Sequence, residues 1–551
     1  MKTNLPKDGW QGLKENFSAD AMSGFLVFLL ALPLSLGIAS ASSFPPIFGL
    51  VTAMIGGIVV SFLAGSPLTI KGPAAGLIVI VAGAVDEFSK FSPNVLPEEA
   101  ATYGWQLALG AVVVAGVIQI LFGLLKLGKY SDIFPLSAVH GMLAAIGIII
   151  ISKQIHILFG FNPMIDGKPM VEPVELIMEL KKTFANFLEH KDVLIVGLVS
   201  LFIVFGWPMI PVKALKKIPS ALIVLLVAIP LSMYFGLHNV ADIKEGGIII
   251  KKGYQPLLDF KKGLFEIIGV NVSFEGLSHV GVFIKYVIMF ALVGSLEALL
   301  TVKAIDMMDP FKRKSNTNKD LMAVGFGNIV AGIFGGLPMI SEVARSSANV
   351  NNGGRTRWAN FFHGLFILIF LIFAVTFSDM IPKSALAAML IGVGWKLAHP
   401  KEFGHMFKIG PDQLVVFLVT IITTLATDLL IGIAAGIVLK IILHMFRGVS
   451  LKSIVKAEFK VENNVIHVSG SIVFSNFLKL QAAIQKFPLT EQIHLDVTHV
   501  NFIDHSSIET LHQMENEFKL NGGMLDVIGL NHFENLHGSK HHLAARKKMT
   551  R

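Results

Sequence analysis

The 551-residue chain has no cysteine, and only 15% of its residues are charged, compared with roughly 25% in an average soluble protein. The absence of cysteine excludes disulfides, thiolate metal ligands and a cysteine nucleophile. The scarcity of charge, together with 53% hydrophobic residues, argues against a soluble enzyme. Between Ala21 and Ile70 there is no Asp, Glu, Lys or Arg, which leaves room for two membrane crossings of about 20 residues each. These features predict a polytopic membrane protein.

Enzyme signatures are also lacking. The sequence has no Walker motif, no glycine-rich nucleotide turn after a strand, no metal-ligand cluster and no Ser/His/Asp set, so it is not expected to be an enzyme. The formal charge of +8 is better explained by basic cytoplasmic loops than by nucleic-acid binding. The first apolar segment has a full spanning length and continues directly into a second one, so we expect it to be retained rather than cleaved as a signal peptide.

Two regions differ in their pattern of apolar residues. About fourteen apolar segments recur in a transmembrane region at residues 19–447, after a cytoplasmic N-terminus at residues 1–18. Beyond it, strand-like alternation and helical spacing predict the order strand, helix, strand, helix, strand, at residues 466–473, 477–487, 492–503, 505–520 and 524–530. This order predicts a small α/β domain at residues 451–545. The His- and Lys-rich segment from His537 to Arg551, which includes the tail at 546–551, is expected to be solvated and frayed rather than a metal site.

The third and tenth apolar segments are too short to span a membrane. The third ends at Asp86 soon after Gly72-Pro73, and the tenth lies between Gly335-Gly336-Leu337-Pro338 and Gly353-Gly354. They occupy the same position in the first and second sets of seven segments. Short segments interrupted by Gly and Pro at matching positions predict an inverted repeat whose broken helices meet at a binding site near the midplane of the membrane.

Loop charges predict the orientation. Loops on one side are basic, as at Lys312 to Lys314 and at Arg355 and Arg357, whereas loops on the other side are acidic, mixed or nearly uncharged. Since positive charge accumulates on the cytoplasmic side, both termini are expected in the cytoplasm and the protein in the plasma (inner) membrane.

Five motifs, in order, resemble the sulfate permease (SulP) family of anion transporters with a C-terminal STAS domain. They are Ala31-Leu32-Pro33-Leu34-Ser35-Leu36-Gly37, Gly72-Pro73-Ala74-Ala75-Gly76, Ser295-Leu296-Glu297-Ala298-Leu299-Leu300-Thr301 with Asp306 and Asn328, the tenth segment through Arg355-Thr356, and Phe502-Ile503-Asp504-His505-Ser506-Ser507. The resemblance implies a seven-plus-seven inverted-repeat transporter. Its core domain (segments 1–4 and 8–11) would move against a gate domain (segments 5–7 and 12–14), commonly in a homodimer.

The chain departs from the family pattern in two places. His505 follows Asp504 where some STAS domains of bacterial regulators have a phosphorylatable Ser, so the resemblance does not support control by phosphorylation there. Lys71 and Lys303 add charge that other branches need not have. The stretch from Glu297 to Asp306 is similar to branches associated with carbonic anhydrase, which favours bicarbonate without settling the anion.

The broken helices predict an anion site. A helix that starts inside the membrane points unpaired N–H groups and the positive end of its dipole at the site, which suits a small oxyanion. Two such starts, near Gly72 and near Ile340-Ser341, are expected to face one another. The alternative is that these small residues only permit close helix packing. The predicted anion-binding residues are Leu34, Ser35, Gly72, Pro73, Ala74, Ala75, Ser341, Glu342, Val343, Ala344 and Arg345.

Glu297 lies within an apolar segment, where an ionised carboxylate costs about 3 kcal/mol on insertion scales, so a functional role is the default interpretation. We expect Glu297, with Thr301 one turn away on the same face, to take up a proton or Na⁺ during transport. Glu342 is a second such carboxylate, and Arg345 is the natural partner of either. The alternative is a Glu–Arg pair that only joins two helices. No cofactor is expected beyond this coupling ion.

Other polar residues have simpler interpretations. Lys71 either attracts anions or extends to the membrane surface. His140 and His363 are expected to be packed or hydrogen-bonded rather than to relay protons. Asp504 and Ser506 are expected to cap a helix rather than bind a ligand.

The leading hypothesis is secondary active transport of a small inorganic anion, with bicarbonate or sulfate preferred and H⁺ or Na⁺ as the coupling ion. An anion channel or uncoupled exchanger of the same fold, and a membrane-bound STAS sensor, remain alternatives.

Overall fold

The computed structural model describes residues 5–93, 97–128, 134–162, 164–165, 168–169, 173–212, 215, 218–239, 243–245, 248–251, 256–258, 269–373, 380–427 and 429–549. The chain divides into two compact units, one made of residues 1–128 and 147–396, the other of residues 129–146 and 397–551. The second unit contains the soluble domain together with the last membrane helices.

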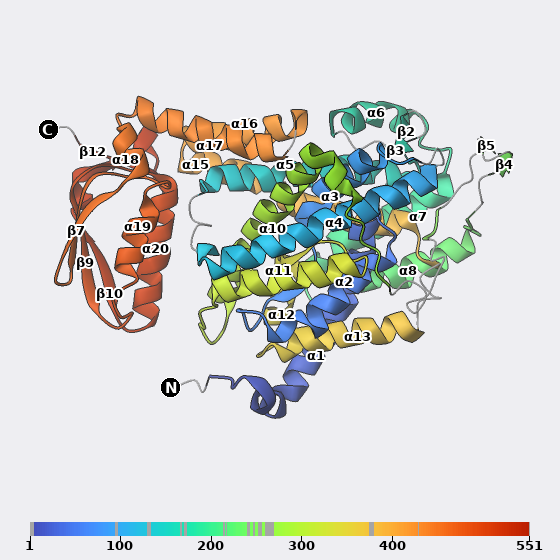
Figure 1. Ribbon diagram of the computed structural model, residues 1–551, viewed down its shortest axis with the longest axis horizontal. Helices are drawn as coiled ribbons and strands as arrows, with labels where there is room; N and C mark the ends of the chain where they lie inside the picture. The colour runs from blue at the N-terminus through green and yellow to red at the C-terminus, as the bar shows by residue number, and fades with distance from the viewer. Residues whose placement is uncertain are drawn as a thin grey trace. The chain divides into compact units, whose positions relative to one another are not determined.

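The expected membrane segments coincide with helices (Figure 1). Within the described residues, six helices are long and apolar enough to cross a membrane. The helices are α1 Gly9–Ala41, α2 Ile47–Ile58, α3 Ile78–Ser89, α4 Pro97–Leu124, α5 Leu136–Leu158, α7 Lys191–Gly206, α8 Ser220–Tyr234, α10 Val280–Met308, α11 Thr317–Ile333, α12 Val343–Asn351, α13 Trp358–Phe373, α14 Lys383–Leu397, α16 Pro411–Ala426 and α17 Leu429–Phe446. Connecting elements include α6 Pro173–Ala185, α15 Pro400–Ile409 and the short hairpins β2 Met164–Ile165 with β3 Lys168–Pro169 and β4 Ile243–Glu245 with β5 Ile248–Lys251.

Small residues let the helices of the first unit pack closely. Gly57 of α2 and Gly364 of α13 lie so near each other that a Cβ on either would overlap the other's backbone. Gly116 of α4 and Gly325 of α11 show the same relation. Contacts of this kind are typical of membrane helices, where close backbone approach replaces the hydrophobic effect as the source of association. Close packing through small residues is therefore found between these helix pairs, outside the two broken segments.

The two broken segments pair with each other. Ile70–Pro73 forms strand β1 and Met339–Glu342 forms strand β6, and the two strands are antiparallel neighbours. A 3₁₀ turn, Ala75–Leu77, leads from β1 into α3, while α12 begins directly after β6. The expectation that the third and tenth segments are interrupted and face one another is confirmed.

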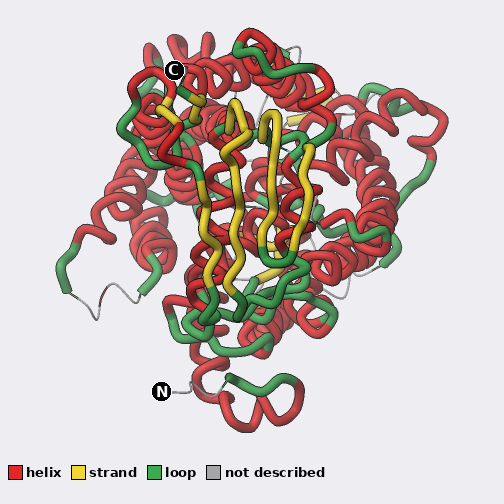
Figure 2. The backbone as a smooth tube through the Cα atoms, turned by 90° about the vertical axis from the view of Figure 1, so that its left-hand side faces the viewer, coloured by secondary structure: helices red, strands yellow, loops and turns green. Residues whose placement is uncertain are grey.

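The soluble domain combines one sheet with helices α18 Leu451–Val455, α19 Phe477–Ile484 and α20 His505–Leu520. Its sheet has the order β11-β12-β9-β8-β7, with β10 also paired to β9. Figure 2 shows the long strands of this sheet side by side in yellow. The strands are β7 Glu458–Glu462, β8 Val465–Ile472, β9 Gln492–Ile503, β10 Met524–Ile528, β11 Phe533–Asn535 and β12 Arg546–Lys548. Alternate residues of β8 and β9 pack against α19 and α20 to form the core, as the strand alternation predicts.

Capping fixes the start of α20. Asp504 Oδ1 accepts a hydrogen bond from the Ser507 N–H at 2.8 Å, and its other carboxylate oxygen accepts from the Phe474 N–H at 2.9 Å. The predicted capping role of Asp504 is confirmed, whereas the Ser506 hydroxyl accepts from the Leu136 N–H at 3.2 Å instead. His505 is only 1% exposed.

The prediction of a solvated, frayed C-terminal segment is wrong for residues 537–549, while residues 550 and 551 lie outside the described part of the chain. Arg546 and Lys547 of β12 pair with the end of β9. Residues 533–535 form β11, which pairs with the other edge of β12. Ala544 and Ala545 are buried, which anchors the strand against the domain. The sequence pattern concealed this strand because its outward positions are Lys and Arg, which also occur in solvated tails.

Candidate functional site

The β1–β6 pair brings the two predicted helix starts together. Lys71 lies opposite Ser341, and Gly72 lies opposite Ile340. Asn328 of α11 holds β6 in place, because its side chain accepts from the Met339 N–H at 2.6 Å and donates to the Met339 carbonyl at 3.2 Å. The predicted residues of the third and tenth segments therefore belong to one site in the first unit.

The two helix starts differ in how their N–H groups are used. Glu342 caps α12, because its carboxylate accepts from the Arg345 N–H at 2.7 Å. Ala74 donates its N–H to the Pro338 carbonyl at 3.3 Å, and both Ala74 and Ala75 are buried. Val343, the first residue of α12, is 45% exposed, so this start opens toward accessible space. Part of the predicted anion-binding capacity at α12 is therefore already taken by the Glu342 carboxylate.

Arg345 carries the largest unused hydrogen-bonding capacity of the site. Its side chain is fully buried, and none of its three guanidinium nitrogens has a hydrogen-bond partner among the described residues. The nearest carboxylate oxygen, on Glu342, lies 4.0 Å from Nε. The guanidinium packs so tightly against Gly72 that a Cβ there would overlap Nη1. A planar cation with five donors thus lies beside the start of the third segment.

Glu297 faces the same region from α10. It is buried, its Oε1 has no hydrogen-bond partner in the described part of the chain, and a Cβ at Gly76 would overlap its carboxylate. Thr301, one turn further along α10, is also buried. Of the two carboxylates predicted to pair with Arg345, Glu342 makes only a long contact of 4.0 Å without a hydrogen bond, and no described ion pair joins Arg345 to Glu297.

Lys71 does not extend to the membrane surface. It is fully buried, and its Nζ donates to Asp320 Oδ1 at 2.8 Å, to the Thr69 hydroxyl at 2.6 Å and to the Ser341 hydroxyl at 2.6 Å. Asp320, in the first turn of α11, is 1% exposed and was missed by the sequence reasoning. The pair leaves no unneutralised charge on Lys71 to attract an anion.

Ser341 is also committed to this pair. Its hydroxyl accepts from Lys71 and donates to Asp320 Oδ2 at 2.9 Å. In this arrangement its one O–H already has an acceptor, so Ser341 could donate to an anion only by giving up the hydrogen bond to Asp320, and its role in anion binding stays a prediction.

The remaining predicted residues vary in their surroundings. Leu34 and Ser35 are buried in α1, which packs against β1 and α12, and the Ser35 hydroxyl has no described partner. Lys303 is half-buried on α10. His140 Nδ1 lies 3.2 Å from Glu402, whereas His363 is fully buried with neither ring nitrogen hydrogen-bonded to a described residue.

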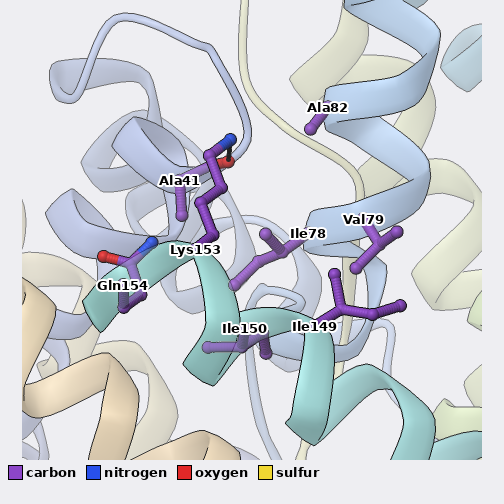
Figure 3. A pocket seen from close by; sticks show the side chains of 8 residues that line it. All are labelled: Ala41, Ile78, Val79, Ala82, Ile149, Ile150, Lys153 and Gln154. Carbon is purple, nitrogen blue, oxygen red and sulfur yellow. Dashed lines mark hydrogen bonds between the residues drawn. The ribbon is translucent and has the colours of Figure 1, made fainter. Parts of the chain in front are cut away.

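A second lysine, Lys153 of α5, was missed by the sequence reasoning. It lines a small cavity of about 20 Å³ with Ile78 and Val79 of α3 and donates to the Ala41 carbonyl, at the end of α1, at 2.9 Å (Figure 3). Its position at the end of an apolar segment resembles an ordinary interfacial lysine. In the structure it links helix α5 to α1.

Comparisons with known proteins identify the family of the chain. The sulfate permease family model matches residues 17–420, and the STAS domain model matches residues 455–532. A putative sulfate transporter of Bacillus subtilis, YvdB, is 26% identical over 528 residues, which cover 94% of this chain and 92% of that protein. The bicarbonate transporter BicA of Picosynechococcus is 25% identical over 379 residues, covering 69% of this chain and 61% of that protein.

Solved structures share the fold. The transmembrane domain of a cyanobacterial bicarbonate transporter BicA aligns with a TM-score of 0.62 at 22% identity, over 76% of this chain and 97% of that one. The structure of SLC26A9 aligns with a TM-score of 0.64 at 16% identity, over 94% and 85% of the two chains. The architecture is thus the inverted-repeat transporter fold with a C-terminal STAS domain, and the relatives are transporters rather than enzymes. The chain belongs to the sulfate permease family.

Proposed function

We propose that this protein is a secondary active transporter of a small inorganic anion, with bicarbonate or sulfate preferred. The observation that carries the proposal is the buried guanidinium of Arg345, with no described hydrogen-bond partner, beside two half-helix starts joined by a strand pair. A buried cation with unused donors is costly unless an anion completes it. A small oxyanion can accept from the planar guanidinium and from N–H groups near Ala75 and Ala344, as oxyanions do at helix starts.

Charge balance supports coupling to a cation. Beside Gly72 and Gly76 the site holds one cationic group, Arg345, and two carboxylates, Glu297 and Glu342, and all three side chains are buried. Entry of an anion adds further negative charge, which a low-dielectric site accommodates poorly. Uptake of H⁺ or Na⁺ at Glu297, with Thr301 supplying a further oxygen for Na⁺, restores the balance. We therefore propose Glu297 as the coupling residue.

Movement of a gate domain against a core domain is the proposed transport mechanism. Lys153 lies on α5, which belongs to the gate in this arrangement, and Ala41 ends α1, which belongs to the core. This hydrogen bond would have to break whenever the two domains separate at that position. The proposal includes a homodimer in the plasma membrane. It also places both termini in the cytoplasm, which the loop charges favour.

Uptake into proteoliposomes tests the proposal. Labelled bicarbonate, sulfate, chloride and dicarboxylates are offered with and without Na⁺ and pH gradients. The parent protein is expected to accumulate one anion above its electrochemical equilibrium only when a Na⁺ or pH gradient is present. Uptake that never exceeds equilibrium under any gradient would favour the channel or uncoupled exchanger instead.

Glu297→Gln tests the coupling step, because it keeps the size of the side chain and fixes its neutral state. Accumulation is expected to vanish while anion binding and downhill exchange persist. Glu87→Gln is the matched control, since Glu87 of α3 is partly exposed and pairs with Lys285 at 3.1 Å. Accumulation by Glu297→Gln equal to that of the parent would contradict the coupling role.

A further inference from the structure

The soluble domain contains a pocket of about 180 Å³ that the transport mechanism does not use. Its floor is apolar and comes from the end of β9, from β10 and from α20, with Ile503, Val527 and Leu511 among the lining residues. One wall is the C-terminal segment, which contributes Leu543 and Arg546. Residues from Ile503 to Arg546, which lie on several different elements, therefore line one pocket beside the sheet.

One end of this pocket is cationic. Arg546 of β12 donates from Nη2 to the His542 carbonyl at 3.2 Å, while its Nε is buried without a hydrogen-bond partner in the described part of the chain. The imidazole of His542 lines the pocket as well. Glu515 is the carboxylate that lines it, and His512 lies 3.4 Å from that carboxylate. No described carboxylate forms an ion pair with Arg546 within 4.0 Å, and Glu515, which also lines the pocket, attracts it only from a longer distance, so a ligand carboxylate could approach Arg546 more closely than Glu515 does.

The C-terminal segment is held firmly enough to form a wall. Besides the strand pairing of Arg546 with Ile503, the His505 Nδ1–H donates to the Leu543 carbonyl at 2.7 Å. Just before the pocket, the Ser539 hydroxyl donates to the Lys408 carbonyl at the end of α15, at 2.7 Å. The wall of the pocket is therefore continuous with a contact to the helix that precedes α16.

Size and chemistry together restrict the occupant. A dry cavity of about 150 Å³ lined by aliphatic side chains holds a benzene molecule, so 180 Å³ suits one ring or a short branched chain. A nucleotide, with a base, a sugar and a phosphate, is much larger. We propose that the soluble domain binds a small monocarboxylate with an apolar body, the carboxylate on Arg546 and the body against Ile503 and Leu511. This site is separate from the proposed anion site and does not depend on it.

Calorimetry on the purified full-length protein in detergent tests this proposal with benzoate and isovalerate as probes. Both are expected to bind saturably, whereas acetate, which lacks the apolar body, and benzamide, which lacks the charge, are expected to bind at least tenfold more weakly. Arg546→Gln is expected to weaken benzoate binding at least tenfold. The matched control is Lys547→Gln, the next residue on β12, which is exposed and removes the same charge; its affinity is expected to stay within twofold of the parent.

Three results would overturn the proposal. They are no saturable binding of benzoate or isovalerate to the parent protein, equal binding of benzamide and benzoate, and equal loss in Arg546→Gln and Lys547→Gln. Hydrogen exchange of peptides from α20 shows whether Arg546→Gln keeps the domain folded. If it does not, Leu511→Phe, which fills the apolar end and leaves the charge in place, is expected to abolish benzoate binding, and unchanged binding in that variant would also overturn the proposal.

Discussion

Arg345→Gln separates an anion-binding role of the guanidinium from a structural one. The side chain is fully buried, and its three nitrogens have no hydrogen-bond partner among the described residues. Among the described residues, the only carboxylate oxygen within 4.0 Å of the guanidinium belongs to Glu342 and lies at that limit, so removing the charge relieves a burial cost about as large as the attraction it loses. Without anion, the free energy of unfolding of the variant is therefore expected to lie within about 1 kcal/mol of the parent's. Breaking a buried ion pair would instead lower it by about 3–5 kcal/mol.

Arg345→Gln is instead expected to be less stable than the parent when the anion is present. A hydrogen bond to a charged group contributes about 1.5–3 kcal/mol, which corresponds to roughly a 10- to 150-fold change in affinity. At an anion concentration of about 100 times its Kd, the parent gains about 2.7 kcal/mol of stability by binding. At the same concentration, a variant that binds about tenfold more weakly gains about 1.4 kcal/mol, and one about 100-fold weaker gains about 0.4 kcal/mol.

Tryptophan fluorescence during thermal unfolding measures both quantities. All five tryptophans lie before the soluble domain, at positions 10, 105, 207, 358 and 395, so the signal reports on the membrane region. Arg357→Gln is the matched control, because Arg357 pairs with the exposed carboxylate of Asp8 at 2.7 Å. If Arg345→Gln instead loses about 3 kcal/mol or more without anion and keeps the parent's response to anion, the residue is a structural partner of Glu342 and the binding argument is refuted.

Three further predictions concern other parts of the molecule. Lys71→Met is expected to destabilise the protein by about 3–5 kcal/mol, since it leaves Asp320 buried and unpaired, and Lys71→Met with Asp320→Asn is expected to recover most of that; equal unfolding of the two would contradict it. Single cysteines at Ser92 and Lys314 should react with impermeant reagents from outside and inside respectively, and the reverse pattern would refute the topology. Burial lowers the pKa of His505 to about 4 from its ordinary 6.5, so the domain should lose up to about 3 kcal/mol as the pH falls from 6.5 to 4; imidazole hydrogen exchange giving a pKa near 6.5 would exclude this.

The sequence was sufficient to locate the broken segments. Their short apolar runs, bounded by Gly and Pro, predict an interruption wherever they occur, and their matching positions in the two halves predict that they meet. The structure confirms the meeting through the pairing of Gly72 with Ile340. The soluble domain could be predicted from the sequence equally well, because the alternation in residues 492–503 and the cap at Asp504 are local signals that need no tertiary context.

Partners that are far apart in the sequence could not be predicted from it. Lys71 and Asp320 are 249 residues apart, and nothing in either local sequence identifies the other as its partner. The same reasoning explains why Ser341 was assigned to the anion and why Lys153 was missed, since a side chain's availability depends on which neighbours already occupy its donors. Residue type and depth in an apolar segment can indicate a polar site, but they do not show which of its groups are already satisfied.

The charged residues of the site form two sets, one on each face of the β1–β6 strand pair. Side chains along a strand point alternately to opposite faces, so Lys71 and Ser341, opposite each other in the β1–β6 pair, belong to the face that meets Asp320 of α11. Gly72, one position on, belongs to the other face, where the Arg345 guanidinium packs against it. The first set is fully hydrogen-bonded and electrically balanced, whereas the second retains unused donors on its cation. Substitutions on the first face should therefore act mainly through stability, and those on the second mainly through ion binding, even though the residues are adjacent in the sequence.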